Sequence, residues 1–595
     1  MSSKPNTSEQ VRILHSLFAS GELIHPYLEQ EYFREGKNNS TVSSFVDLSA
    51  SIAICCGVAE VSTPNTKKDD DLIVEQPVFD SDVCRRRMQL AAEIGGWKEG
   101  VNGNDVYSRK HIVLILCDGM GNSCLEQAFA NGETSSFLMK HNQPARIRAV
   151  FPSTTPAALT TLATASWPGR HGMPGWNLRD KSGVDFPGNS DSGGPTVQLL
   201  ALSDRIKDAR SGVSTQKLGF DTWDKVFVEI PWSRRILDRS DQSRETKKQS
   251  NTIRKMIYIN AYNGDDYQNW SQGSKSEGTN FSSWQMGNLA TRDDNASPFD
   301  TAKIEETAYD TLGEPEGAMN AINFFRNGLD AALSKIAEAE RKDESTFTYL
   351  YTAHPDKHMH ALGVEHPKVQ QVIRGIDSEI ERFWNLLSDR NALLTRFDKN
   401  DGTNEESKRA KMTPKSIDAS VVVTADHGHI TVDPKHMILL PSDVLDCLEY
   451  ANIGVHGKVS RMDGIVFTSN RSTSMITPDA MCFLEHVQGR HGYLHCRSGL
   501  QSILLRRWNS HNTLLEHFII LTVDEAISNG LFGPQSMRQE VRPRLGDFVV
   551  ISKGKHTLVT PNEAETYQNT CRCQGAHGSL LPEEMMIPFI LLERR

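Results

Sequence analysis

The sequence predicts an α/β fold with a mostly parallel β-sheet. Short runs rich in β-branched, apolar and aromatic residues lie at Ile112–Cys117, Thr346–Thr352 and Ser420–Ala425, as is typical of strands buried on both faces of a sheet. Between the last two runs, six apolar residues share one face at helical spacing: Val369, Val372, Ile373, Ile376, Ile380 and Phe383. Strands that alternate with helices indicate a parallel sheet with right-handed crossovers.

Two further segments complete the predicted pattern. Pro156–Ala165 is small and apolar, and it begins with a proline, which suits the first turn of a helix. Met586–Leu592 is expected to add a last buried strand near the C-terminus.

Length and composition limit the classes of protein that this chain can belong to. A chain of 595 residues is too long for one hydrophobic core, so we expect one large domain with substantial insertions, or two domains. Apolar residues make up 38% and charged residues 24%, which suits a soluble globular protein with long polar loops. The net charge of −10 provides no basic surface for nucleic acid. Because no run of about 18 apolar residues occurs, we expect no transmembrane segment.

The N-terminus and the cysteines predict a cytoplasmic protein. Met1–Gln10 is polar and lacks the apolar region of a secretory signal. The ten cysteines contain no C-x-x-C pair, which argues against a zinc ribbon and favours free thiols. The oligomeric state is not indicated.

Potential metal ligands follow the predicted strands. Asp118 and Asp426–His427 come directly after a strand, and Asp356 follows one within four residues. In a parallel sheet, ligands bind just beyond the carboxyl ends of the strands, so these side chains are expected at one edge. His360 lies four residues after Asp356, on the same face if this segment is helical.

Other histidines compete for these roles. His354, His358 and His366 lie in the same segment as His360, so the local pattern leaves the choice among them open. His577 stands between a small residue and a glycine just before the last predicted strand, from where it could join the others. Mixed Asp and His ligation without thiolate suits Zn²⁺, with Mn²⁺ or Fe as alternatives. Two such ions about 4 Å apart are suited to phosphoryl transfer.

A hydroxyl cluster lies at the start of the predicted helix that begins with Pro156. Thr155 immediately precedes this proline, where backbone N–H groups and the helix dipole favour an anion. Its hydroxyl needs a nearby metal to become a good nucleophile. Ser153 and Thr154 remain alternatives on local grounds.

These residues lie in motifs that occur in the order of a known family. In this order, the motifs are Leu116–Gly121, Phe151–Pro156 with His171-Gly172, Asp356-x-x-x-His360, Thr424–Gly428 and His577–Met585. Two further segments, Asn529–Gly533 and Arg544–Asp547, resemble bacterial members of the family. From about Ser40 to the end, the chain resembles the alkaline phosphatase superfamily, and within it the type I phosphodiesterase/nucleotide pyrophosphatase branch. The resemblance implies an alkaline-phosphatase-like three-layer α/β/α sandwich with an inserted subdomain.

The resemblance also implies roles for the residues. Asp356, His360 and His577 would hold one zinc ion. Asp118, Asp426 and His427 would hold the other, and Thr155 would bridge toward it. Ungapped alignment from Pro152 to His171 selects Thr155 as the nucleophile, which would form a phosphothreonine intermediate.

The resemblance also frames the domain organisation. We expect a smaller inserted α+β subdomain at residues 437–555, between the last two metal motifs. The catalytic domain would comprise residues 40–436 and 556–595, with polar insertions near 180–300, and residues 1–39 would be an N-terminal extension. Four polar segments are expected to be surface loops: Asp180–Gly194, Asp238–Asn251, Gly264–Asp300 and Phe397–Ser416.

The expected activity is hydrolysis of a small organic phosphate, most simply by a di-zinc phosphodiesterase or nucleotide pyrophosphatase. One departure from the family bears on this expectation: nucleotide pyrophosphatases carry asparagine three residues after the nucleophile, where this chain has Ala158. Arg170, Arg179 and Lys357 are candidates for binding phosphate only by their proximity in sequence.

Other activities use a similar metal set. A phosphomonoesterase or a phosphonate hydrolase is the alternative enzyme, and an inactive metal-binding module is the alternative that is not an enzyme. A sulfatase is disfavoured because it needs an oxidisable Cys or Ser at position 155, and a cofactor-independent phosphoglycerate mutase because it would use Ser there.

Overall fold

The computed structural model describes residues 8–36, 41–56, 81–98, 106–107, 109–130, 136–144, 146–172, 174–175, 177–179, 196–198, 254–260, 315–397, 416–432, 434–448, 450–455, 458–463, 490–539, 541–559 and 574–593. The predicted loops Asp180–Gly194, Asp238–Asn251 and Gly264–Asp300 lie outside these residues, as does Phe397–Ser416 apart from its two ends.

The larger unit of the structure has a five-stranded sheet at its centre, in the order β21-β10-β4-β9-β8. Its strands are β4 (His111–Cys117), β8 (Arg254–Asn260), β9 (Ser345–Thr352), β10 (Ala419–Thr424) and β21 (Ile590–Glu593). All neighbours are parallel except β21, which is antiparallel to β10 at the edge. Every residue of β4 and β10 is buried, because helices cover both faces of the sheet. The predicted mostly parallel α/β sheet is confirmed.

The last predicted strand is two strands. Met586–Ile587 forms β20, which pairs with β5 (Ile147–Arg148) in a separate small sheet, and Ile590–Glu593 forms β21 in the central sheet. Pro588 lies between them, and because proline has no N–H to donate, it is suited to the point where the chain leaves one sheet for the other.

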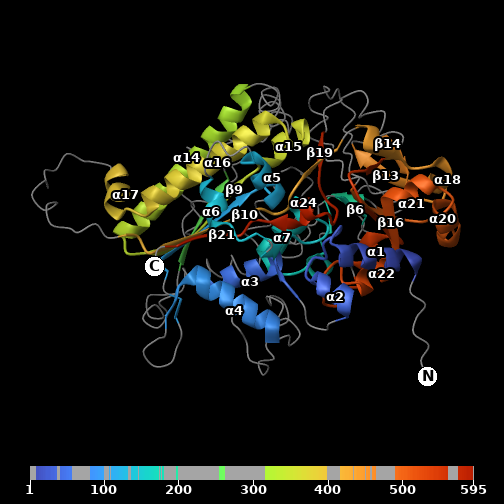
Figure 1. Ribbon diagram of the computed structural model, residues 1–595, viewed down its shortest axis with the longest axis horizontal. Coiled ribbons are helices and arrows are strands. Elements are labelled where there is room, and N and C mark those ends of the chain that lie inside the picture. The colour runs from blue at the N-terminus through green and yellow to red at the C-terminus, as the bar shows by residue number, and fades with distance from the viewer. Residues whose placement is uncertain are drawn as a thin grey trace, which may run out of the picture.

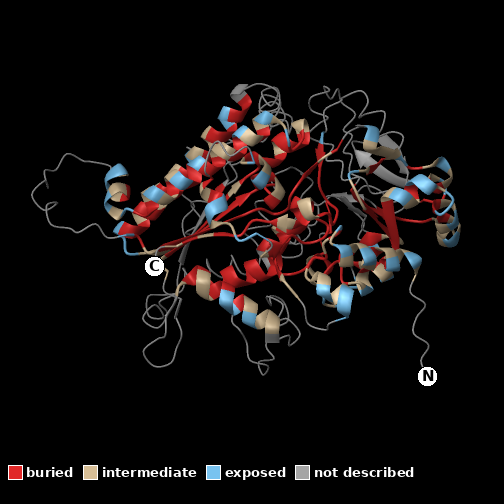
Figure 2. Ribbon diagram, viewed as in Figure 1, coloured by how far each residue is buried: buried red, intermediate tan, exposed pale blue. Residues whose placement is uncertain are grey.

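Two helical layers enclose the sheet, as Figure 1 shows. One layer contains α14 (Pro315–Arg341) and α16 (Pro367–Leu387), with α14 against β8 and β9. The opposite layer contains α3 (Phe45–Cys55) and α4 (Ser81–Gly95), with α4 against β10. All six apolar residues predicted to share one face of α16 are buried. Figure 2 shows the same arrangement, in which the strands are buried, α4, α14 and α16 have both buried and more exposed residues, and α3 is buried almost throughout.

A smaller unit has its own antiparallel sheet, in the order β15-β17-β16. These strands are β15 (His491–Leu494), β16 (Phe518–Thr522) and β17 (Phe548–Ser552), and the helices around them are α18 (Ser442–Leu445), α20 (Gln501–Trp508), α21 (Asn512–His517) and α22 (Val523–Ser528). A second hydrophobic core, which includes the fully buried Trp508, lies among this sheet, α18, α20 and α21. The inserted α+β subdomain at residues 437–555 stays a prediction.

The N-terminal helices α1 (Glu9–Ser20) and α2 (Gln30–Glu35) lie beside this smaller unit. His25 donates a ring N–H to the Asn529 carbonyl at 2.9 Å, and the Ile24 N–H donates to the Leu580 carbonyl at 2.7 Å. Residues 24 and 25 therefore connect the smaller unit to the segment that contains Leu580.

The other described elements are short. The helices are α5 (Asn122–Ala128), α6 (Phe137–His141), α7 (Thr155–Thr164), α8 (Pro168–His171), α15 (Asp356–Leu362), α17 (Arg390–Arg396), α24 (Pro582–Met585), η3 (Pro434–His436) and η4 (Arg542–Leu545). The strands are β1 (Ser43–Ser44), β2 (Trp97–Lys98), β3 (Val106–Tyr107), β6 (Asn177–Arg179), β7 (Thr196–Gln198), β11 (Ile430–Thr431), β12 (Met437–Leu439), β13 (Tyr450–Val455), β14 (Lys458–Asp463), β18 (Thr557–Val559) and β19 (Gly575–Ala576). No helix within the described ranges is long and apolar enough to cross a membrane.

Candidate metal centre

Three strand ends deliver carboxylates to one edge of the sheet. Asp118 follows β4, Asp426 follows β10, and Asp356 begins α15 just after β9. Backbone hydrogen bonds fix two of them together, because the Asp118 N–H donates to the Thr352 carbonyl at 3.0 Å and the Asp356 N–H donates to the Asp118 carbonyl at 3.1 Å. The predicted convergence at the carboxyl ends of the strands is therefore present.

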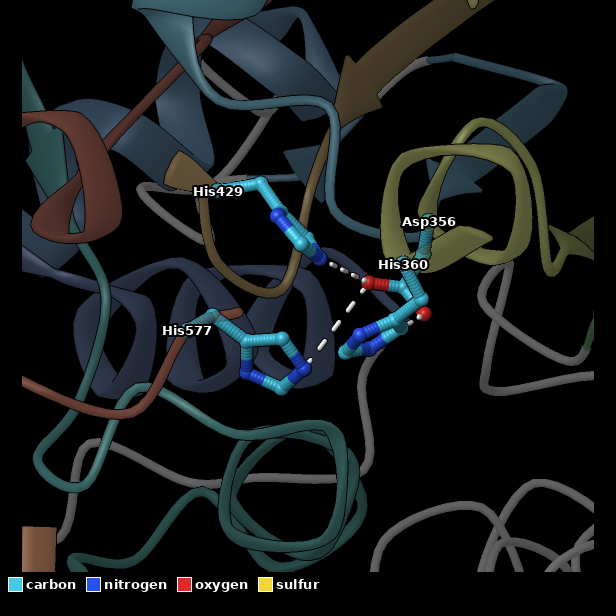
Figure 3. A group of neighbouring side chains, drawn as sticks. All are labelled: Asp356, His360, His429 and His577. Carbon is cyan, nitrogen blue, oxygen red and sulfur yellow. Dashed lines mark ion pairs between the residues drawn. The ribbon is translucent and has the colours of Figure 1, made fainter. Parts of the chain in front are cut away.

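A first cluster consists of four buried side chains: Asp356, His360, His429 and His577 (Figure 3). One donor atom from each lies within 4.8 Å of the others. Asp356 Oδ1 is 3.4 Å from His429 Nε2 and 3.8 Å from His577 Nε2, while Asp356 Oδ2 is 3.4 Å from His360 Nε2. The helix that begins at Asp356 brings His360 to the same face, as its spacing predicts.

Backbone carbonyls set the orientation of these histidine rings. Nδ1 of His360 donates to the Gly575 carbonyl at 2.9 Å, and Nδ1 of His577 donates to the Ser153 carbonyl at 2.8 Å. Nδ1 of His429 lies 3.2 Å from the Ile430 carbonyl. A neutral ring that carries its proton on Nδ1 presents the Nε2 lone pair, which is how a histidine oriented by an outer partner binds a metal.

A second cluster contains Asp118, Asp356 and His427, whose donor atoms also lie within 4.8 Å of one another. His427 Nε2 is 3.5 Å from Asp118 Oδ1 and 3.4 Å from Asp426 Oδ2. The other oxygen of Asp426 accepts N–H groups from Gly119 and His427, each at 3.0 Å. Asp426 thus lies beside this cluster with Oδ2 directed toward His427, and Asp356 is close to both clusters.

The negative charge of the three carboxylates is concentrated and buried. Burial, followed by the charges of Asp426 and Asp356, raises the pKa of Asp118 well above its ordinary value. Burial and the charge of Asp426 raise the pKa of Asp356 in the same way. Burial and the neighbouring histidines lower the pKa of His577. In the described part of the chain, the three carboxylates form ion pairs only with histidines.

Divalent cations fit this arrangement. Asp356 Oδ1 and Asp426 Oδ2 are buried, and neither has a hydrogen-bond partner among the described residues. Buried carboxylate oxygens without partners are costly, and a cation among them would offset that cost. The donor set contains oxygen and imidazole nitrogen without thiolate, which suits zinc and several other transition metals.

Of the three hydroxyls at the start of α7, only that of Thr155 has a described contact with these clusters. Thr155 Oγ1 is 3.4 Å from Asp118 Oδ1 and 3.1 Å from His427 Nε2. Ser153 Oγ instead donates to the Ser579 carbonyl at 2.7 Å and accepts the Gly578 N–H at 3.1 Å. The Thr154 hydroxyl is buried without a hydrogen-bond partner in the described region.

The competing histidines lie outside the two clusters. His354 and His358 contact each other through their Nδ1 atoms at 3.1 Å, and the His366 ring accepts the Lys368 N–H at the start of α16. The phosphate-binding candidates differ in their relation to the centre. Arg170 donates to the Ser536 carbonyl at 3.3 Å, and the side chain of Arg179 lies outside the described part. Lys357 follows Asp356 directly, and its charge opposes the rise in the pKa of that carboxyl.

Two residues of this centre were not predicted from the sequence. His429 follows His427 by two positions in an extended segment, so both rings can point to the same side, and the second histidine of His-Gly-His was the available signal. Tyr351 donates its hydroxyl to Asp118 Oδ2. The only signal for Tyr351 was its position near the end of a predicted strand beside the one that precedes Asp118.

The solved structures that this chain resembles include two proteins of low sequence identity. Phosphonoacetate hydrolase from Sinorhizobium meliloti, in complex with phosphonoformate, is 14% identical with a TM-score of 0.42, and the match covers 83% of this chain and 92% of that one. An inactive form of murine ectonucleotide pyrophosphatase/phosphodiesterase 5, in complex with AMP, is 12% identical with a TM-score of 0.42, covering 80% and 87%. No curated protein matches the sequence.

The family assignment rests on a family model. The model for type I phosphodiesterase/nucleotide pyrophosphatase matches residues 112–580, which is most of the chain and includes every predicted metal ligand. The family predicted from the motifs is confirmed. The chain therefore belongs to the type I phosphodiesterase/nucleotide pyrophosphatase family and is a hydrolase of phosphoric esters.

Proposed function

We propose that this protein is a two-metal phosphodiesterase that works through a phosphothreonine intermediate on Thr155. The observation that carries the proposal is the position of Thr155 Oγ1 beside Asp118 and His427, at the first residue of α7. A small organic phosphate is the substrate class that the family supports. The cytoplasmic location expected from the sequence stays a prediction.

The proposed ligands follow the two clusters. Asp356, His360 and His577 would hold one ion, with His429 within reach of it. Asp118, Asp426 and His427 would hold the other. The donors suit zinc. Two divalent ions, when bound, would lower the pKa of the nucleophilic hydroxyl and neutralise the charge of the phosphoryl oxygens.

The residues of the chain perform the remaining tasks. Thr155 gives up its hydroxyl proton to solvent, and Oγ1 forms a bond to phosphorus as the bond between phosphorus and the oxygen of the leaving alcohol breaks. The alcohol departs with a proton from solvent. Water then attacks the phosphothreonine, which releases a phosphomonoester and restores the hydroxyl. Thr155 is the first residue of α7, so the positive end of the helix dipole lies at this point and would stabilise the added negative charge.

The test compares Thr155→Ala with Thr154→Ala, a matched control that removes the adjacent hydroxyl. Initial rates are measured on bis(p-nitrophenyl) phosphate, p-nitrophenyl phosphate and phosphonoacetate, with zinc content determined for each variant. We expect Thr155→Ala to lose about three orders of magnitude or more in kcat while Thr154→Ala keeps its activity. Full activity of Thr155→Ala on every substrate would refute the assignment of Thr155 as the nucleophile.

The substrate arm of the test addresses the reaction class. A preference for the diester that depends on Thr155 supports the phosphodiesterase. A preference for the monoester or for phosphonoacetate, with the same dependence on Thr155, would move the protein to one of the alternative activities. Bound zinc without turnover of any substrate would instead support the inactive metal-binding module.

A further inference from the structure

Tyr351 is the penultimate residue of β9 and contacts the end of β4 from the neighbouring strand. It pairs with Leu116 in the parallel register, and the next pair is Cys117 with Thr352. Asp118 therefore leaves the sheet directly beside Tyr351. The Asp118 N–H is bound by the Thr352 carbonyl, and its Oδ2 accepts the Tyr351 hydroxyl. This aspartate is held at both its backbone and its side chain by the end of β9.

The two oxygens of Asp118 consequently face different partners. Oδ1 lies 3.4 Å from Thr155 Oγ1 and 3.5 Å from His427 Nε2, on the side of the nucleophile. Oδ2 is occupied by the phenol. A carboxylate that can turn freely offers either oxygen, or both, to a cation. Fixing one oxygen by a hydrogen bond selects the other as a single donor and sets its direction.

We infer that Tyr351 is a positioning residue of the metal centre, which acts through Asp118 by holding Oδ2 so that Oδ1 faces Thr155 and His427. The inference rests on the proposed function, because it requires that Asp118 bind a metal ion. Tyr351 does not reach the nucleophile in any described contact, so its effect is expected on the affinity and geometry of the site.

The decisive comparison is Tyr351→Phe with Tyr349→Phe. Both substitutions remove one phenol hydroxyl from the same face of β9, since the two positions are two residues apart. Zinc affinity is measured by competition with a chromophoric chelator, alongside turnover at limiting and saturating zinc. Wild type is expected to bind two zinc ions per chain. We expect Tyr351→Phe to weaken one of the two by about 10–100-fold, the range typical of losing an outer partner of a metal ligand.

The other readouts separate positioning from a structural role. Tyr349→Phe is expected to keep both affinities. Placing 4-aminophenylalanine at position 351 keeps an N–H donor at the ring's para position, so it is expected to recover much of the lost affinity. This variant also serves if Tyr351→Phe does not fold. Unchanged affinity in Tyr351→Phe, or no better affinity with 4-aminophenylalanine than with phenylalanine, would overturn the inference and leave the proposed function standing. Absence of zinc from wild type would overturn both.

Discussion

Arg490 and Glu584 form an ion pair in which neither side chain is accessible to solvent. Arg490 Nη2 is 2.8 Å and Nε is 3.1 Å from the two carboxylate oxygens of Glu584. Arg490 immediately precedes β15 of the smaller unit, whereas Glu584 lies in α24 beside the metal loops. The Glu584 carboxylate accepts the Ser579 N–H at 3.0 Å, and its backbone carbonyl accepts the Gly428 N–H at 2.8 Å. The pair therefore links the smaller unit to the loops that carry His577 and His427.

Removal of one partner of this pair should be costly. Arg490→Met leaves the Glu584 carboxylate buried without its guanidinium, so we expect a loss of about 3–5 kcal/mol in the free energy of unfolding. The measurement is urea unfolding followed by circular dichroism. Arg12→Met is the control, because Arg12 pairs with Glu9 at 2.9 Å on the surface and should change stability by less than about 1 kcal/mol. Equal effects of the two substitutions would contradict the structural importance of the buried pair.

His25 should make the protein less stable in acid. Its Nδ1 accepts N–H groups from Leu28 at 3.0 Å and Tyr27 at 3.3 Å, so protonation at this atom breaks both bonds. Burial lowers the pKa of His25 to about 3 in the folded state, against an ordinary value of 6.5. The unfolded chain therefore binds more protons between pH 6.5 and 3. The contribution to stability is present above 6.5 and is lost as the pH falls through this window.

The size of this effect follows from the two pKa values. Between pH 7 and pH 5, His25 alone should reduce the free energy of unfolding by about 2 kcal/mol. His25→Asn keeps an acceptor near Nδ1 but does not titrate. The slope of the free energy of unfolding against pH, measured by urea unfolding, gives the number of protons taken up on unfolding. This number should be lower by about one in this variant. An unchanged slope would show that His25 does not carry the linkage.

Gly119 allows Asp356 to approach Asp118. Its φ of +71° is left-handed, and a Cβ there would lie 2.9 Å from Asp356 Cβ and Oδ1. We expect Gly119→Ala to lose about 1–2 kcal/mol from backbone strain and also to weaken zinc binding by displacing the carboxylate. Gly36→Ala is the matched control, since Gly36 has a φ of +63° and nothing within 4 Å of its added Cβ. Zinc affinity should fall only in Gly119→Ala. Equal affinity in both variants would show that a Cβ at position 119 does not displace the Asp356 carboxylate.

The sequence predicted the parts of the fold that depend on local pattern. β4, β9 and β10 were predicted within about one residue, because strands buried on both faces are nearly continuous apolar or β-branched runs. β8 was not predicted, because Arg254 and Lys255 interrupt the apolar pattern at its start. This strand lies at the edge of the sheet and pairs with a neighbour, β9, on one side only. The division of Met586–Leu592 into two strands was also missed. Its pairing with two different sheets depends on contacts with distant segments.

The candidate site likewise contains residues whose positions could be predicted from the sequence and residues whose positions could not. Asp118, Asp426 and His427 stand directly after strands, so the topology of a parallel sheet places them together. The partners that orient these groups could not be predicted, because they come from separate parts of the chain. Examples are Tyr351 on Asp118, and the Ser153 carbonyl on His577 across more than 400 residues.

His429 is the donor that distinguishes a closed site from an open one. With Asp356, His360 and His577 it completes four donors, the number found in closed tetrahedral zinc sites, whereas three protein ligands leave a position for water or substrate. We expect His429→Ala to weaken one zinc ion by at least the 10–100-fold typical of losing an outer partner. His366→Ala, which removes a ring outside both clusters, should change neither affinity.

Turnover then decides which kind of site His429 makes. If His429 binds the ion throughout the reaction, its removal opens a coordination position, and kcat at saturating zinc should be maintained or rise. If His429 only orients Asp356 through the 3.4 Å contact, its removal frees the carboxylate, and kcat should fall even at saturating zinc. Unchanged affinity together with unchanged kcat in His429→Ala would exclude both roles. The position of the ring beside Asp356 would then reflect packing alone.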